Sequence, residues 1–105
     1  MSAPAYRRRL QLLAEFVVAS LPSDWHTATL RASFPSSART RLEILCEAGG
    51  DGRQEPVEIP SAMTYDFAQA ARAVRSELVR AGSPECKAFV FALSKSGGSS
   101  LEVEY

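Results

Sequence analysis

Hydrophobic side chains recur every three or four positions in residues 4–21, which is the repeat of an amphipathic α-helix. The apolar stripe expected for this helix, including two residues that widen it, consists of Tyr6, Leu10, Leu12, Leu13, Phe16, Val17 and Leu21. Ser2 can cap the helix, Pro4 suits its first turn, and Pro22 follows its end.

The same period covers residues 65–81 and predicts a second helix. Its expected apolar stripe consists of Phe67, Ala71, Val74, Leu78 and Ala81. Thr64 is the expected N-cap, and Gly82 is the expected stop at the other end. The side chains expected on the solvent side of this helix are Arg72, Arg75, Glu77 and Arg80.

Alternation of apolar and polar residues predicts half-buried strands at residues 25–34, 40–47 and 101–105. In the first, the expected core face consists of His26, Ala28, Leu30, Ala32 and Phe34, with Trp25 on the opposite face. In the other two, the expected core face consists of Leu42, Ile44, Cys46, Leu101, Val103 and Tyr105.

Two further stretches have strand character without alternation. Residues 86–93 are apolar on both faces, which is typical of a strand at the centre of its sheet. Residues 57–59 are bracketed by Pro56 and Pro60, so we expect a short strand at an edge. Clusters of Pro, Gly and Ser predict turns at 35–37, 49–52 and 96–99.

The elements follow one another as helix, two or three strands, helix and two strands, joined by short connections. This order predicts an α+β fold, a two-layer sandwich in which two helices cover one face of an antiparallel sheet of four to five strands. In shorthand the order is α-β-β-(β)-α-β-β. With 105 residues, we expect a single domain over 1–105.

Acidic side chains are expected on the sheet face that the helices leave open. Those residues are Glu43, Glu47, Glu102 and Glu104, and the small residues Ala88, Val90 and Ala92 share the face with them. Carboxylates around a small apolar strip are a candidate surface for binding a partner protein. The alternative is an ordinary solvated face, since antiparallel sheets commonly leave one side wet.

Charge and hydropathy then narrow the class of partner. Twelve basic and twelve acidic residues give no net charge, whereas nucleic-acid binders usually carry a basic surplus. The apolar run of residues 10–21 is too short to span a bilayer and has no signal-peptide pattern. We therefore expect a cytoplasmic protein that binds neither nucleic acid nor membrane.

The residues that usually carry chemistry are few. His26 is the only histidine, and nothing in the sequence points to a triad of His26 with a nucleophilic Ser or Cys and a supporting acid. Cys46 and Cys86 are expected as buried thiols. The alternative is a disulfide between them, which requires that their strands be neighbours. One histidine and two distant cysteines do not make a zinc site. We expect no enzyme activity, no cofactor and no metal.

Four features of the chain resemble the YezG-type immunity proteins, the antitoxins that partner bacterial polymorphic toxins. A first helix runs through a proline turn into Trp25, and a late helix follows at residues 70–78. A hydrophobic strand with a glycine turn covers residues 89–98, and the terminal strand ends in Tyr105.

The resemblance implies a binding protein that neutralises a cognate toxin domain, often a nuclease, by protein–protein association. We expect a monomer or a weak homodimer. The alternative is a protein like the type III secretion chaperones, which share this order of elements and also act by binding. A small enzyme or ligand-binding domain is a third class, which a large pocket lined by His26 and carboxylates would favour.

Overall fold

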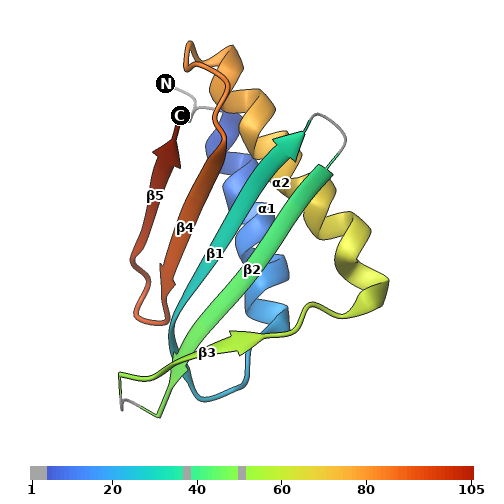
Figure 1. Cartoon of the computed structure of the whole chain (residues 1–105). Coiled ribbons are helices and arrows are strands. Elements are labelled where there is room, and N and C mark those ends of the chain that lie inside the picture. The colour runs from blue at the N-terminus through green and yellow to red at the C-terminus, as the bar shows by residue number, and fades with distance from the viewer. Residues whose placement is uncertain (1–4, 37–38, 50–51) are drawn as a thin grey trace.

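A five-stranded antiparallel sheet carries both helices on one face, as the computed structural model in Figure 1 shows for residues 5–36, 39–49 and 52–105. The elements are α1 (Ala5–Ser20), β1 (Trp25–Ser36), β2 (Arg39–Ala48), β3 (Gln54–Val57), a 3-10 turn η1 (Ser61–Met63), α2 (Thr64–Arg80), β4 (Ala88–Ser94) and β5 (Ser99–Glu104). The predicted α+β fold is confirmed. The predicted cap Ser2, the first-turn residue Pro4, and parts of two predicted turns, Ser37 and residues 50–51, lie outside the described residues.

The strand order β3-β2-β1-β4-β5 puts β1 at the centre of the sheet. The chain forms the β1–β2 hairpin, passes through β3 and α2, and returns so that β4 pairs with the free side of β1. The stretch expected at the centre, β4, is therefore an interior strand beside it. Its neighbour β5 forms one edge of the sheet and β3 forms the other.

The core fills the space between the sheet and the helices. Its fully buried larger side chains are Leu13, Val17, Leu30, Phe67, Val74, Cys86 and Phe89. The rings of Phe16 and Phe67 join the two helices with their centroids 5.6 Å apart. Burial of apolar side chains between two layers is the main force that stabilises such a fold.

The predicted helical stripes are correct at their centres and wrong at their margins. In α1, Leu12 is 48% exposed because it lies to one side of the buried Leu13 and Val17. Ala81 likewise falls just beyond the end of α2 and is exposed.

The ends of α2 were only partly predictable. Thr64 does not cap the helix but begins it, because η1 leads directly into α2, and its hydroxyl donates to the Pro60 carbonyl. At the other end, Gly82 adopts a φ of 101° and Ser83 donates its N–H to the Leu78 carbonyl, as expected for a glycine stop.

A β-bulge reverses the expected faces at the start of β1. The pairing of β1 with β2 slips by one residue between Trp25 and Thr27, so Trp25 is buried and His26 is exposed. The sequence prediction had these two side chains on the opposite faces, because strict alternation allows no extra residue. From Ala28 to Phe34 the predicted core face is confirmed.

Several strand boundaries differ from those predicted, including the start of β4, which is Ala88 and not Cys86. β1 continues through Pro35 to Ser36, where the expected turn would begin, and a second slip accompanies this extension. β3 starts earlier than expected and ends at Val57, so Glu58 and Ile59 of the predicted strand lie outside it. It includes Pro56, which an edge strand tolerates because one side of it makes no ladder hydrogen bonds. β5 likewise starts at Ser99, two residues before the predicted strand.

Side chains expected in solvent hold α2 to the sheet. The Arg72 Nε donates to the Thr40 hydroxyl at 2.8 Å, and the Arg75 guanidinium lies 4.6 Å from the centroid of the Phe34 ring. Tyr105, which was expected in the core, is 58% exposed, and its hydroxyl shares a hydrogen bond of 2.6 Å with Ser83. The predicted strand was one residue too long, because β5 ends at Glu104 and Tyr105 lies beyond it.

Candidate functional site

The sheet face that the helices leave bare is called the open face here. The pairing register places on it Thr27, Thr29, Arg31 and Ser33 of β1, Arg41, Glu43, Leu45 and Glu47 of β2, Ala88, Val90, Ala92 and Ser94 of β4, and Ser100, Glu102 and Glu104 of β5. Hydroxyl, charged and small apolar side chains thus share this surface. Leu45 is its exposed large hydrophobic residue, with 39% of its surface accessible.

All four acidic residues predicted for this surface lie on the open face, but they do not form one cluster. Glu43 and Glu47 belong to β2, whereas Glu102 and Glu104 belong to β5. Two strands, β1 and β4, separate the pairs. At about 4.8 Å per strand, the two pairs are roughly 14 Å apart across the sheet.

Arg31 stands between the two acidic pairs and was not singled out from the sequence. Its direct neighbours across the strands are Glu43 on β2 and Val90 on β4. Its guanidinium reaches past Val90 and donates to the Glu104 carboxylate at 2.8 Å. The small side chains of β4 leave room for this ion pair, which therefore bridges three strands.

The four carboxylates differ in how far the fold already uses them. Glu47 accepts hydrogen bonds from the Gly52 N–H at 3.1 Å and from the Thr27 hydroxyl at 3.4 Å, so it holds the β2–β3 turn. Glu104 is occupied by Arg31. Among the described residues, Glu43 and Glu102 form no ion pair. These two are the carboxylates that remain available to a partner.

A shallow hollow of about 330 Å³ interrupts the open face next to Ala92. Hydroxyl groups surround it, from Thr27, Thr29, Ser94 and Ser100. Because Ala92 is small and its neighbours are short, a side chain of a partner can enter here and meet hydroxyl groups that both donate and accept hydrogen bonds.

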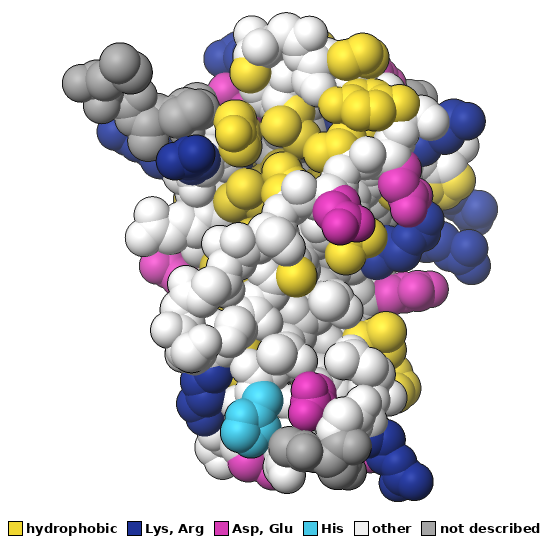
Figure 2. Space-filling model, turned by 90° about the vertical axis from the view of Figure 1, so that its left-hand side faces the viewer, with side chains coloured by type: hydrophobic (Ala, Val, Ile, Leu, Met, Phe, Trp, Pro, Cys, Tyr) yellow, Lys and Arg dark blue, Asp and Glu magenta, His cyan; other side chains and the backbone are white. Residues whose placement is uncertain are grey.

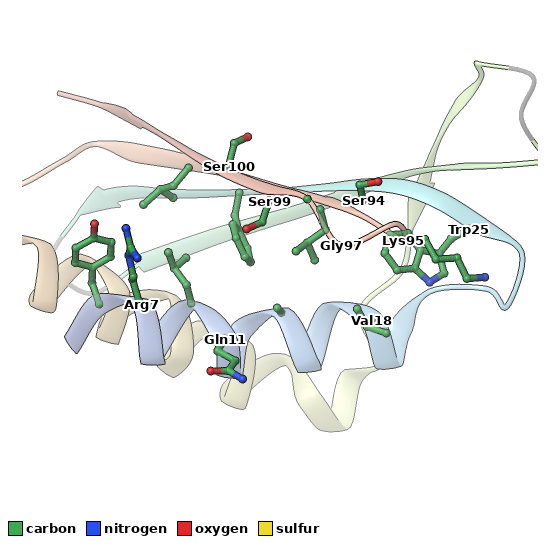
Figure 3. A pocket seen from close by; sticks show the side chains of 16 residues that line it. Arg7, Gln11, Val18, Trp25, Ser94, Lys95, Gly97, Ser99 and Ser100 are labelled. Atoms are coloured by element: carbon green, nitrogen blue, oxygen red, sulfur yellow. The ribbon is translucent and has the colours of Figure 1, made fainter. Parts of the chain in front are cut away.

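A larger hollow lies between α1 and the β4–β5 hairpin and is called the α1–β5 groove. It has a volume of about 770 Å³ and opens at the β5 edge, the side of the molecule shown in Figure 2, where hydrophobic side chains gather in the upper half. In Figure 3, Trp25 and Lys95 lie together at one end of the groove, and Arg7 lies at the other.

The groove was not predicted from the sequence. Its walls include Tyr6 and Leu10 of α1 and Leu101 of β5, all expected to be buried. They are only half-buried, because the helical layer does not close against the last strand. The periodic pattern identifies such residues as apolar, yet it cannot tell a filled core from a groove.

The candidate reactive groups lie apart from these hollows. His26 is exposed, and none of the described groups of His, Cys, Asp and Glu is arranged to hold a metal ion. Cys46 and Cys86 are both buried and both free thiols. Burial raises the pKa of the Cys46 thiol, with smaller contributions from the carboxylates of Glu55 and Asp24, so this cysteine stays protonated near neutral pH.

In the ranges that the structure describes, no helix is both long and apolar enough to cross a membrane.

Comparison of the chain with models of known protein families finds no match, and comparison with curated proteins finds none either. The chain is thus characterised by its own geometry, a bare sheet face on one side and a groove along one edge.

Proposed function

We propose that this chain is an immunity protein that binds a cognate bacterial toxin domain in the cytoplasm and neutralises it through the open face. The observation that carries the proposal is the bare face itself, with Glu43 and Glu102 on either side of Arg31 and neither in an ion pair with any residue that the structure describes. A rigid sheet presents such groups without the ordering cost that a flexible loop would incur on binding.

The charges of the open face favour a partner with basic groups. The available carboxylates of the open face, Glu43 and Glu102, lie on both sides of the small apolar strip formed by Val90 and Ala92. A nuclease fits this pattern, because a surface that binds phosphates is rich in lysine and arginine. Carboxylates that meet such a surface would accelerate association and occupy the groups that bind substrate.

The test begins with identifying the partner and ends with charge reversal. The protein is captured from its host with whatever binds it stoichiometrically, and the partner is purified for calorimetry. We expect a toxin-like domain, and we expect the double variant Glu43→Lys/Glu102→Lys to bind it at least about tenfold more weakly, since charges that complement a partner contribute on this scale. Glu15→Lys, on the exposed side of α1, is the matched control and should bind normally.

Other results would contradict the proposal in different ways. Normal affinity of the double variant would remove the open face from the contact. Recovery of a secreted effector by a dimeric bait would favour the alternative, a protein like the type III secretion chaperones. Cells that express the toxin domain and this chain together should survive. If such cells die although the two proteins form a stable complex, the immunity role is excluded.

A further inference from the structure

The outer edge of β5 presents backbone groups that the sheet does not use. The Ser94 N–H donates to the Gly98 carbonyl at 2.8 Å and closes the β4–β5 hairpin. Hydrogen bonding alternates along an antiparallel pair, so Ser100 and Glu102 direct their N–H and C=O groups toward β4. Leu101 and Val103 therefore direct theirs away from the sheet, as an edge strand does.

The residues with outward backbone groups also have side chains on the helical side. Leu101 and Val103 are half-buried and pack against the core. Beneath them, the α1–β5 groove is walled by Leu10 and Ala14 of α1 and opens at the same edge. An added strand would hydrogen-bond to β5 through alternate residues, and the side chains of those residues would enter the groove.

The remaining residues of an added strand would lie over the open face. Their nearest neighbour there would be Glu102, which makes no ion pair among the described residues. A basic side chain at these positions would complement that carboxylate, as opposite charges do when they face each other across strands. The edge thus specifies a strand in which apolar and basic residues alternate.

We propose that β5 and the α1–β5 groove accept an extended segment of a partner protein, with alternating apolar and basic residues, as a sixth strand of the sheet. This is the β-augmentation mode of peptide recognition, in which main-chain hydrogen bonds give affinity and side-chain pockets give specificity. A second copy of the chain fits less well, because antiparallel pairing of β5 with itself brings Glu102 and Glu104 of both copies together. The proposal does not depend on the open-face contact proposed above.

The experiment uses a synthetic peptide of alternating valine and lysine. Trp25 is the only tryptophan and lines the groove, so its fluorescence reports occupancy directly. We expect saturable one-to-one binding with a change in Trp25 emission. Replacing the lysines by glutamates should weaken binding at least about tenfold, because like charges would then face Glu102.

Backbone methylation separates strand addition from simple apolar contact. Methylation of the backbone nitrogens of the valines removes the N–H groups that face β5 and should abolish binding. Methylation of the backbone nitrogens of the lysines leaves the valine N–H groups intact and should change the affinity little. This comparison uses the unaltered protein, so it does not depend on whether any variant folds. Equal loss with both modified peptides would overturn the proposal, and so would absence of binding by the unmodified peptide.

A matched pair of protein variants locates the site. Ala14→Phe places a large ring in the groove and should abolish peptide binding, whereas Ala19→Phe, on the exposed side of α1, should not. Binding that persists in a folded Ala14→Phe variant would place the peptide elsewhere. A dimer in sedimentation that Ala14→Phe dissociates would assign the edge to a second copy and overturn the proposal. Failure of the open-face test would leave all these results standing.

Discussion

The guanidinium of Arg75 connects α2 to β1 and to the segment that precedes β4 through three contacts. It lies 4.6 Å from the centroid of the Phe34 ring, donates to the Cys86 carbonyl at 2.9 Å, and pairs with Glu85 at 2.8 Å. Its side chain is 20% exposed, so water screens these contacts only in part. Arginine suits this place because its planar group can stack and donate at the same time.

We predict that Arg75→Ala lowers the free energy of unfolding by about 2 kcal/mol, the sum expected for a stacked cation and a hydrogen bond left unmade. Urea denaturation followed by circular dichroism measures this. Arg80→Ala is the control, because the Arg80 side chain is 80% exposed and its Nη1 lies as far as 3.8 Å from the Glu77 Oε1. Its effect should stay below about 0.5 kcal/mol, as for surface residues in general. Equal losses in both variants would contradict the role given to Arg75.

The raised pKa of Cys46 makes a prediction about alkaline stability. The unfolded thiol loses its proton near the ordinary pKa of 9.0, whereas burial keeps the folded thiol protonated. The contribution of the protonated Cys46 thiol to the free energy of unfolding is therefore fully present below pH 9.0, and it is lost as the pH rises through the pKa of the folded state. The free energy of unfolding of the wild type should fall faster above this pH than that of Cys46→Ala. Parallel pH profiles would show that the thiol ionises freely in the folded chain.

At the scale of elements, the two edges of the sheet differ in how they are protected. β3 contains Pro56, which cannot donate to a further strand and so blunts that edge. β5 has no proline between Ser99 and Glu104, and its outward residues Leu101 and Val103 are apolar. This contrast leaves β5 as the edge suited to pair with another strand.

Amide hydrogen exchange tests the proposed direction of the β5 backbone. The amides of Ser100 and Glu102 face β4 and should exchange at least about tenfold more slowly than those of Leu101 and Val103, which face outward. Saturation with the valine–lysine peptide should slow exchange at Leu101 and Val103. Uniform exchange along the free strand would contradict the assigned alternation, and unchanged rates with bound peptide would contradict strand addition.

At the scale of the whole molecule, the two candidate surfaces lie on different sides of the sheet. The open face looks away from the helices, while the α1–β5 groove lies between α1 and the hairpin (Figures 1 and 3). Glu43 on β2 is three strand positions from β5. A molecule built this way can contact one partner at two places, or two partners at once.

We predict that variants of the two surfaces act independently. Glu43→Lys alone should weaken binding of the proposed toxin domain and leave the affinity for the valine–lysine peptide within about twofold, because Glu43, unlike Glu102, belongs to only one of the two surfaces and lies far from the β5 edge. Ala14→Phe should have the reverse effect. Calorimetry with each ligand on each variant measures both affinities. Loss of both ligands in either variant would show that the surfaces form a single site.

The sequence by itself determined the two helices, the strands and the core positions from Ala28 to Phe34. These follow from local backbone geometry, because a helix or a strand repeats its faces every 3.6 or two residues whatever it packs against. The available carboxylates Glu43 and Glu102 were also placed correctly, since alternation within each strand fixes their face once the helices are assigned to the other.

Only the tertiary structure decided the features that depend on distant segments. Arg31 and Glu104 are 73 residues apart, and their ion pair exists because β4 returns to pair with β1. The bulge at Trp25, which exchanged the faces of Trp25 and His26, arises in the pairing with β2 and leaves no local signature. The α1–β5 groove depends on how far the helical layer extends over β5. Packing between layers sets that distance, and no period along the chain encodes it.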